Sequence, residues 1–150
     1  MLVPANVELR GGRWVPLITT VRIIGINLTG ATFKMQVRLY PDAPGSPLYE
    51  GLTVTSATAE GVRLVYGGSA TVSAHIAAGR LTEIPDGMLG TDSLNLTILG
   101  IRVNETTMEG FPFPDERGND LELAWDLHVT VTDKQKYMGG KFVVEAGVTQ

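Results

Sequence analysis

Residues 31–39 read ATFKMQVRL, and this stretch decides the fold class of the chain. A side-chain repeat of two residues places alternate residues on opposite faces of a β-strand, so the pattern predicts a strand with one face in the core. The preceding turn, Asn27-Leu28-Thr29-Gly30, suits a strand start because Asn and Gly tolerate positive φ. Residues 40–47 contain three prolines and end the strand.

A second alternating stretch, LELAWDLHVTV at residues 121–131, predicts a longer strand with Trp125 in the core. Residues 133–136 form a polar turn, and Lys141 to Thr149 read as a closing strand, so residues 120–149 are expected to form a β-hairpin. Further strands are expected at Leu48 to Ser56, at Gly61 to Tyr66, and at Leu94 to Val103 with a bulge around Gly100.

Helical spacing occurs in one segment, Ser73 to Ile84, which Pro85-Asp86-Gly87 stops. Many short strands with one short helix indicate an all-β fold, and we expect an immunoglobulin-like antiparallel β-sandwich. The length of 150 residues predicts one domain spanning residues 1–150.

The composition argues against several classes of function. The net charge of -4, with 12 Lys and Arg scattered along the sequence, argues against nucleic-acid binding. The chain has no cysteine, which excludes disulfides, thiolate zinc sites and a Cys nucleophile. Its apolar runs are too short to cross a membrane, and no signal peptide is recognisable, so synthesis in the cytoplasm is expected. A mean hydropathy of +0.11 suggests that some apolar surface meets a partner.

No catalytic constellation is visible. The two histidines, His75 and His128, lack the Ser and carboxylate context of a triad. An acidic cluster does not have the spacing of an EF-hand loop and reads as a solvated loop; it comprises Asp115, Glu116, Asn119, Asp120 and Glu122. We therefore expect no enzyme activity, no catalytic residue, no metal and no cofactor.

One loop is the candidate partner-binding site. No periodic apolar pattern places the two rings of this loop in the core. The loop, Phe111, Pro112, Phe113 and Pro114, would therefore supply rigid apolar anchors for a neighbouring protein. The residues leave a second possibility open, in which this loop folds back over an open end of the sandwich.

The order of several blocks resembles that of small tailed-bacteriophage virion proteins. The first block is NLTGAT at residues 27–32, which runs into MQVR at residues 35–38. The others follow in the family's order: GVRLV (61–65), a helix and turn ending IPDG (84–87), WDLHVT (125–130) and GKFVVEAGVT (140–149).

The resemblance implies an immunoglobulin-like or baseplate-upper-protein-like β-sandwich that is a non-enzymatic component of the virion. A tail tip, baseplate or tail-fibre attachment component is expected, packed as a homo-oligomer against other virion structural proteins, with no nucleic-acid or membrane partner. Two alternatives are a capsid decoration or head-tail joining protein and a carbohydrate-binding receptor module. Compared with the family pattern, residues 88–124 are an insertion, which we expect to be an arm that reaches a neighbouring subunit.

Overall fold

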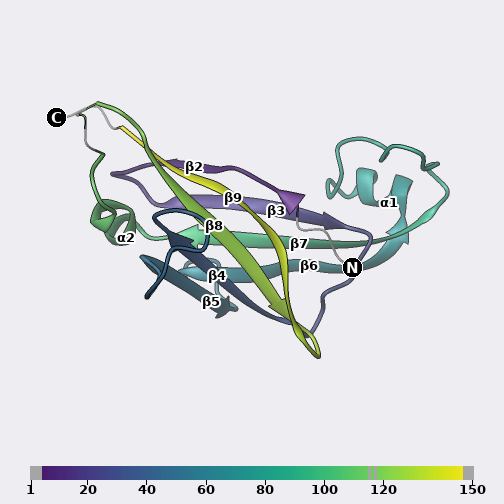
Figure 1. Cartoon of the computed structure of the whole chain (residues 1–150). Coiled ribbons are helices and arrows are strands. Elements are labelled where there is room, and N and C mark those ends of the chain that lie inside the picture. The colour runs from purple at the N-terminus through teal and green to yellow at the C-terminus, as the bar shows by residue number, and fades with distance from the viewer. Residues whose placement is uncertain (1–4, 115, 117, 147–150) are drawn as a thin grey trace.

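The computed structural model describes residues 5–114, 116 and 118–146, and in this part of the chain nine strands form one mixed sheet. The strand order is β1-β9-β8-β4-β5-β6-β7-β3, and β2 also pairs with β9 (Figure 1). The elements are β1 (Ala5–Asn6), β2 (Leu9–Gly12), β3 (Leu17–Ile24), β4 (Thr32–Arg38), β5 (Tyr49–Val54), β6 (Gly61–Thr71), α1 (Val72–Ala77), β7 (Ser93–Val103), α2 (Glu105–Gly110), β8 (Leu121–Thr130) and β9 (Lys134–Glu145).

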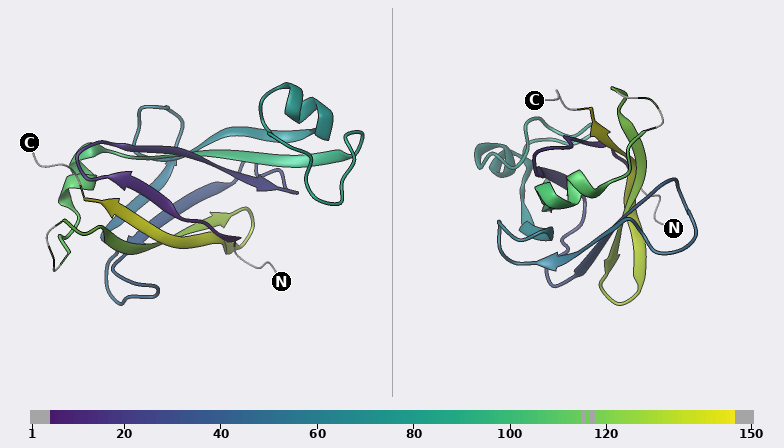
Figure 2. Two further views of the ribbon diagram at one scale, coloured as in Figure 1. Left: turned by 90° about the horizontal axis from the view of Figure 1, so that it is seen from above. Right: turned by 90° about the vertical axis from the view of Figure 1, so that its left-hand side faces the viewer.

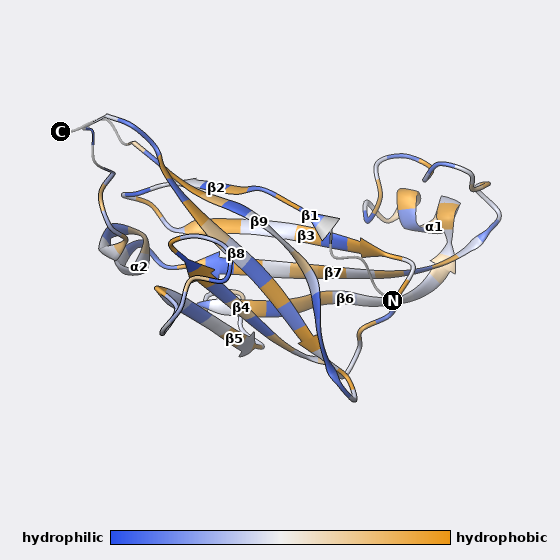
Figure 3. Cartoon of the chain, viewed as in Figure 1, coloured by the Kyte–Doolittle hydropathy of each residue, from blue (hydrophilic) through white to orange (hydrophobic). Residues whose placement is uncertain are grey.

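The strand predicted from residues 31–39 is confirmed as β4, which pairs with β5 on one side and β8 on the other. Its apolar residues Phe33, Met35 and Val37 are buried, whereas the residues between them lie on the outer face. In the preceding turn, Thr29 donates its backbone N–H and its hydroxyl to the Asn27 side-chain oxygen. The alternation of polar and apolar residues that predicted these strands is visible along β8 in Figure 3.

The predicted C-terminal hairpin is confirmed as β8 and β9, and Trp125 is buried as expected. The turn lies at residues 131–133, earlier than predicted, because Lys134 and Lys136 already pair with Thr130 and His128. The last residues of the predicted closing strand, 147–149, lie outside the described residues.

The all-β class is confirmed, but an immunoglobulin-like antiparallel sandwich is not. Strand β5 joins what would be two separate sheets, because its first part pairs antiparallel with β4 and its end pairs parallel with β6. Strands β1 and β2 are also parallel to their partner β9. The sheet wraps around its core into a nearly closed barrel, seen end-on in Figure 2.

Residues 88–124, the predicted insertion, were expected to project as an arm, but the part that forms strand β7 does not. Strand β7 lies inside the sheet between β6 and β3, and it contributes Leu99, Ile101 and Val103 to the core. The predicted bulge lies in the partner strand β6, between Leu64 and Tyr66, rather than in β7 at Gly100. Helix α2, which the sequence pattern did not predict, covers one open end of the barrel and buries Met108 (Figure 2).

The predicted helix is present but short. Helix α1 starts after Thr71, whose hydroxyl caps the backbone N–H of Ala74, and it stops before Gly79, which has a φ of 77°. Packed on the far ends of β6 and β7, α1 helps to enclose a second, smaller core that contains Val72, Leu81, Leu94, Leu96 and Ile98. No helix in the described part of the chain is long and apolar enough to cross a membrane.

Candidate interaction surface

The loop predicted to bind a partner follows α2, and the structure separates its two aromatic rings. Phe111 is only 3% exposed and packs edge-on against Phe142, with ring centroids 5.4 Å apart. This residue therefore does what the alternative prediction expected of the loop, folding back over the end of the barrel. Phe113 is 69% exposed and remains available for contact with another molecule.

Arg13, in the turn between β2 and β3, holds this loop in place. Its guanidinium donates to the carbonyl oxygens of Phe111 at 2.6 Å, Pro112 at 2.7 Å and Glu109 at 3.4 Å. The same guanidinium lies 4.2 Å from the centre of the Phe113 ring, within cation–π distance. The loop is thus fixed by three hydrogen bonds from Arg13 and by the contact between the guanidinium and the exposed Phe113 ring.

The buried position of Arg13 has an electrostatic consequence. Its side chain is 5% exposed, and desolvation lowers its pKa from the ordinary arginine value. An arginine remains protonated at neutral pH even so. Hydrogen bonds to three carbonyl oxygens compensate for the lost hydration of the cation, and such charge-assisted bonds are among the stronger ones in proteins.

Two further apolar residues follow Arg13 in the same turn. Trp14 is 48% exposed and Val15 is 54% exposed. We call Trp14, Val15 and Phe113 the end patch, since the β2–β3 turn and the loop after α2 lie at the same end of the molecule in Figures 1 and 2. Exposed Trp and Phe beside an Arg are the residue types that concentrate binding energy in protein interfaces.

The sequence pattern did not predict a role for Arg13 or for Trp14, which lies in the β2–β3 turn and is half exposed. No local signal marks Arg13, because its carbonyl partners are almost a hundred residues further along the chain.

The two histidines have different surroundings. The His75 ring is fully buried; Nδ1 accepts a 3.0 Å bond from Arg80 Nε, and Nε2 lies 2.9 Å from the Leu94 carbonyl oxygen. Because arginine can only donate, the His75 ring is neutral with its proton on Nε2, and its role is structural. His128 lies on the outer face of β8, with Nδ1 3.6 Å from Asp126 Oδ1.

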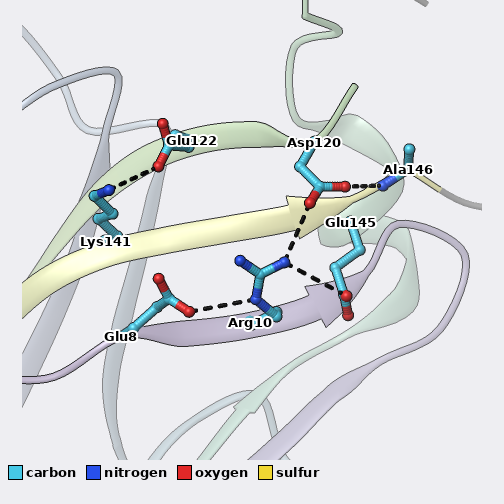
Figure 4. Close-up of polar contacts among 7 residues, drawn as sticks. All are labelled: Glu8, Arg10, Asp120, Glu122, Lys141, Glu145 and Ala146. Atoms are coloured by element: carbon cyan, nitrogen blue, oxygen red, sulfur yellow. Dashed lines mark hydrogen bonds and ion pairs between the residues drawn. The ribbon is translucent and has the colours of Figure 1, made fainter. Parts of the chain in front are cut away.

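The acidic residues of the predicted solvated loop do not converge on one point. Asp120 accepts from Arg10 at 3.1 Å and from the backbone N–H of Ala146 at 2.9 Å, whereas Glu122 pairs with Lys141 at 3.0 Å (Figure 4). Glu116 bonds Asn119, and Asp115 lies outside the described residues. No group of three or more His, Cys, Asp or Glu side chains in the described ranges is placed to hold a metal ion.

Comparison with protein-family models, with curated proteins and with solved structures finds no match to this chain.

Proposed function

We propose that the protein is a non-enzymatic structural component of a tailed-phage virion, in a tail tip, baseplate or fibre attachment region. It works through protein–protein contacts, with copies of itself and with other virion proteins. The resemblance of five sequence blocks to small virion proteins supports the virion context.

The observation that carries the contact function is the rigid presentation of Phe113. An apolar side chain that is 69% exposed would ordinarily pay an entropic cost when a partner immobilises it. Here the loop is already fixed by Arg13 and by the buried Phe111 ring, so much of that cost falls on folding rather than on binding. Trp14 and Val15 extend the apolar area that a partner would cover.

Self-association tests this proposal directly. Size-exclusion chromatography with light scattering should give a mass that rises with concentration for the wild type, and the double variant Trp14→Ala/Phe113→Ala should remain a monomer. The matched control is Val131→Ala, because Val131 is as exposed as Phe113 but lies in the β8–β9 turn, outside the end patch. A wild-type protein that stays monomeric at high concentration would contradict the homo-oligomer.

The virion assignment has a separate test in the genome that encodes the chain. Neighbouring genes for tail-tip or fibre proteins are the expected result, and a position beside the major capsid gene would instead favour a decoration or head-tail joining protein. A position within a metabolic operon would overturn the virion assignment.

A carbohydrate-binding module is the second candidate, and the exposed ring of Trp14 is the observation that favours it. Sugar rings stack on exposed aromatic faces, and Tyr40 in the loop after β4 is also exposed. Binding on a glycan array that Trp14→Ala abolishes would favour this candidate over the structural one.

A further inference from the structure

The strand pairing gathers cations that are scattered in the sequence. The chain has four lysines, and all of them lie on β4 and β9, the two strands that flank β8. Lys34 of β4 pairs with His128 of β8, and His128 pairs with Lys136 of β9. In the next row Thr130 pairs with Thr32 on one side and Lys134 on the other.

A hollow of about 320 Å³ opens at these two rows. Its polar lining consists of Lys34, Lys134, His128 and the hydroxyl-bearing residues Thr32, Thr53 and Thr130. Thr53 is already used, since its hydroxyl bonds the backbone of Phe33. The hollow therefore presents two ammonium groups, an imidazole and the hydroxyls of Thr32 and Thr130.

The positive groups are not neutralised by the described part of the protein. Lys34, Lys134 and Lys136 form no ion pair there, whereas Lys141, the fourth lysine, is paired with Glu122. Asp126 is the acid that faces His128, yet the 3.6 Å between its Oδ1 and Nδ1 of His128 is too long for a hydrogen bond. Both of these buried atoms lack a hydrogen-bond partner among the described residues.

Like charges on directly opposed positions of neighbouring strands destabilise a sheet. The pKa of His128 responds to this crowding: desolvation lowers it first, Asp126 raises it, and Lys134, Lys136 and Lys34 lower it further. The fold thus holds mutually repelling groups around one hollow, an arrangement that an anion would stabilise.

We propose that the hollow between β4, β8 and β9 binds a tetrahedral oxyanion, phosphate or sulfate. Lys34 and Lys134 supply charge-assisted donors, and the hydroxyls of Thr32 and Thr130 supply neutral ones. The volume of the hollow exceeds that of one anion. The hollow therefore has room for a free phosphate or sulfate ion or for an ester of it carried by a larger molecule. The site is independent of the end patch and of the proposed virion function.

Binding is coupled to the protonation of His128. An anion stabilises the imidazolium form, so occupancy raises the pKa of His128, and by linkage the affinity rises as the pH falls through that pKa. The groups that face His128 are Asp126 on its own strand, Lys34 on β4, and Lys134 and Lys136 on β9. Asp126 moderates the effect without reversing it, since three lysines oppose one carboxylate.

The test is an NMR titration of the full chain with sodium sulfate and sodium phosphate at pH 5 and pH 8, with sodium chloride at matched ionic strength as the reference. We expect saturable shifts of the backbone amides of Thr130 and Lys134 with both anions. Sulfate keeps the same charge over this pH range, so it reports the protonation of His128 and should bind at least about threefold tighter at pH 5. The His128 ring protons should titrate at higher pH in phosphate than in chloride. Shifts that do not saturate, or that chloride reproduces, would overturn the proposal.

Two lysine variants locate the site. Lys134→Gln should weaken phosphate binding at least about tenfold, because it removes a charged donor from the lining. Lys141→Gln is the matched control: it lies on the same strand and has the same charge, but it belongs to the Glu122 pair outside the hollow. Equal weakening by both variants would mean a diffuse charge effect and no site.

A titration with a hexose phosphate distinguishes a free anion from a phosphate ester as the ligand. Tighter binding of the hexose phosphate than of inorganic phosphate, again lost in Lys134→Gln, means that the site takes an ester. Equal binding means that the free anion is the ligand.

Discussion

The indole N–H of Trp125 donates a 2.8 Å hydrogen bond to the carbonyl oxygen of Val7. Trp125 lies on β8, and Val7 lies between β1 and β2, beyond the intervening strand β9. The bond thus ties the N-terminal segment to a strand two positions away in the sheet. The Trp125 side chain is buried, and the hydrogen bond to Val7 is itself partly buried.

Trp125→Phe should lower the free energy of unfolding by about 2–4 kcal/mol, because it leaves the Val7 carbonyl without its donor and removes buried volume. Urea denaturation followed by far-UV circular dichroism measures the loss. Trp14→Phe is the control, since the Trp14 ring is half exposed, and it should change stability by less than about 0.5 kcal/mol. Equal effects of the two substitutions would show that the bond to Val7 contributes nothing.

Gly140 pairs with Trp125 across the two strands and makes room for the Val7 carbonyl. A Cβ at position 140 would collide with that oxygen, so Gly140→Ala should displace the N-terminal segment and destabilise the protein by about 1–3 kcal/mol. The matched substitution is Gly110→Ala at the end of α2, where a Cβ meets nothing within 4 Å. Thermal unfolding of both variants should show a lower Tm for Gly140→Ala alone.

Arg13→Lys tests whether the loop after α2 depends on a forked donor. A lysine keeps the charge but cannot reach three carbonyl oxygens with the guanidinium geometry, so we expect a loss of about 1–3 kcal/mol. Hydrogen exchange should accelerate in the segment that contains Phe111 and Phe113. Arg63→Lys is the reference, because no hydrogen bond of the Arg63 side chain is among the described contacts. Unchanged exchange in Arg13→Lys would show that Phe111 alone holds the loop.

Asp120 makes the stability of the protein depend on pH in the acid range. Its pKa is lowered, first by the bond from the Ala146 N–H and next by the bond from Arg10. A carboxylate with a depressed folded pKa contributes stability above its unfolded pKa, and this contribution disappears as the pH falls through the folded value. The Tm of Asp120→Asn should therefore lie below that of the wild type near pH 7, and the two should converge as the pH falls through the folded pKa of Asp120. Asp86→Asn, at an exposed loop position, should follow the wild type throughout.

Local alternation was sufficient to predict the strands that face the core on one side. Strand β4 and the β8–β9 hairpin follow directly from the alternation of Phe33, Met35 and Val37 and of Leu123, Trp125 and Leu127. The alternation within a strand does not predict which other strand it pairs with. The parallel contact of Thr53 with Val62, which joins the two parts of the sheet, has no local signature because parallel and antiparallel edges use the same residue types.

Elements whose stability comes from distant partners were also missed. Helix α2 has an N-cap residue, Asn104, whose side chain makes no capping bond; Glu60, from the turn before β6, accepts the Asn104 N–H and the Thr107 hydroxyl at 2.7 Å each. The loop Phe111–Pro114 was recognised as unusual from its prolines and aromatic rings, but Arg13, which fixes it, lies in a different part of the sequence. The lysines of the oxyanion hollow likewise come together only through strand pairing.

The parallel pairing of β2 with β9 has a consequence for how the protein is made. Leu9 pairs with Phe142 and Gly12 with Glu145, so during synthesis β2 has no strand partner until β9, more than a hundred residues further along the sequence, has emerged from the ribosome. Chains dominated by such distant pairings fold slowly, typically in milliseconds to seconds. The barrel therefore closes only after β9 has emerged, and until then Leu9, which is buried in the folded protein, stays without its partner strand.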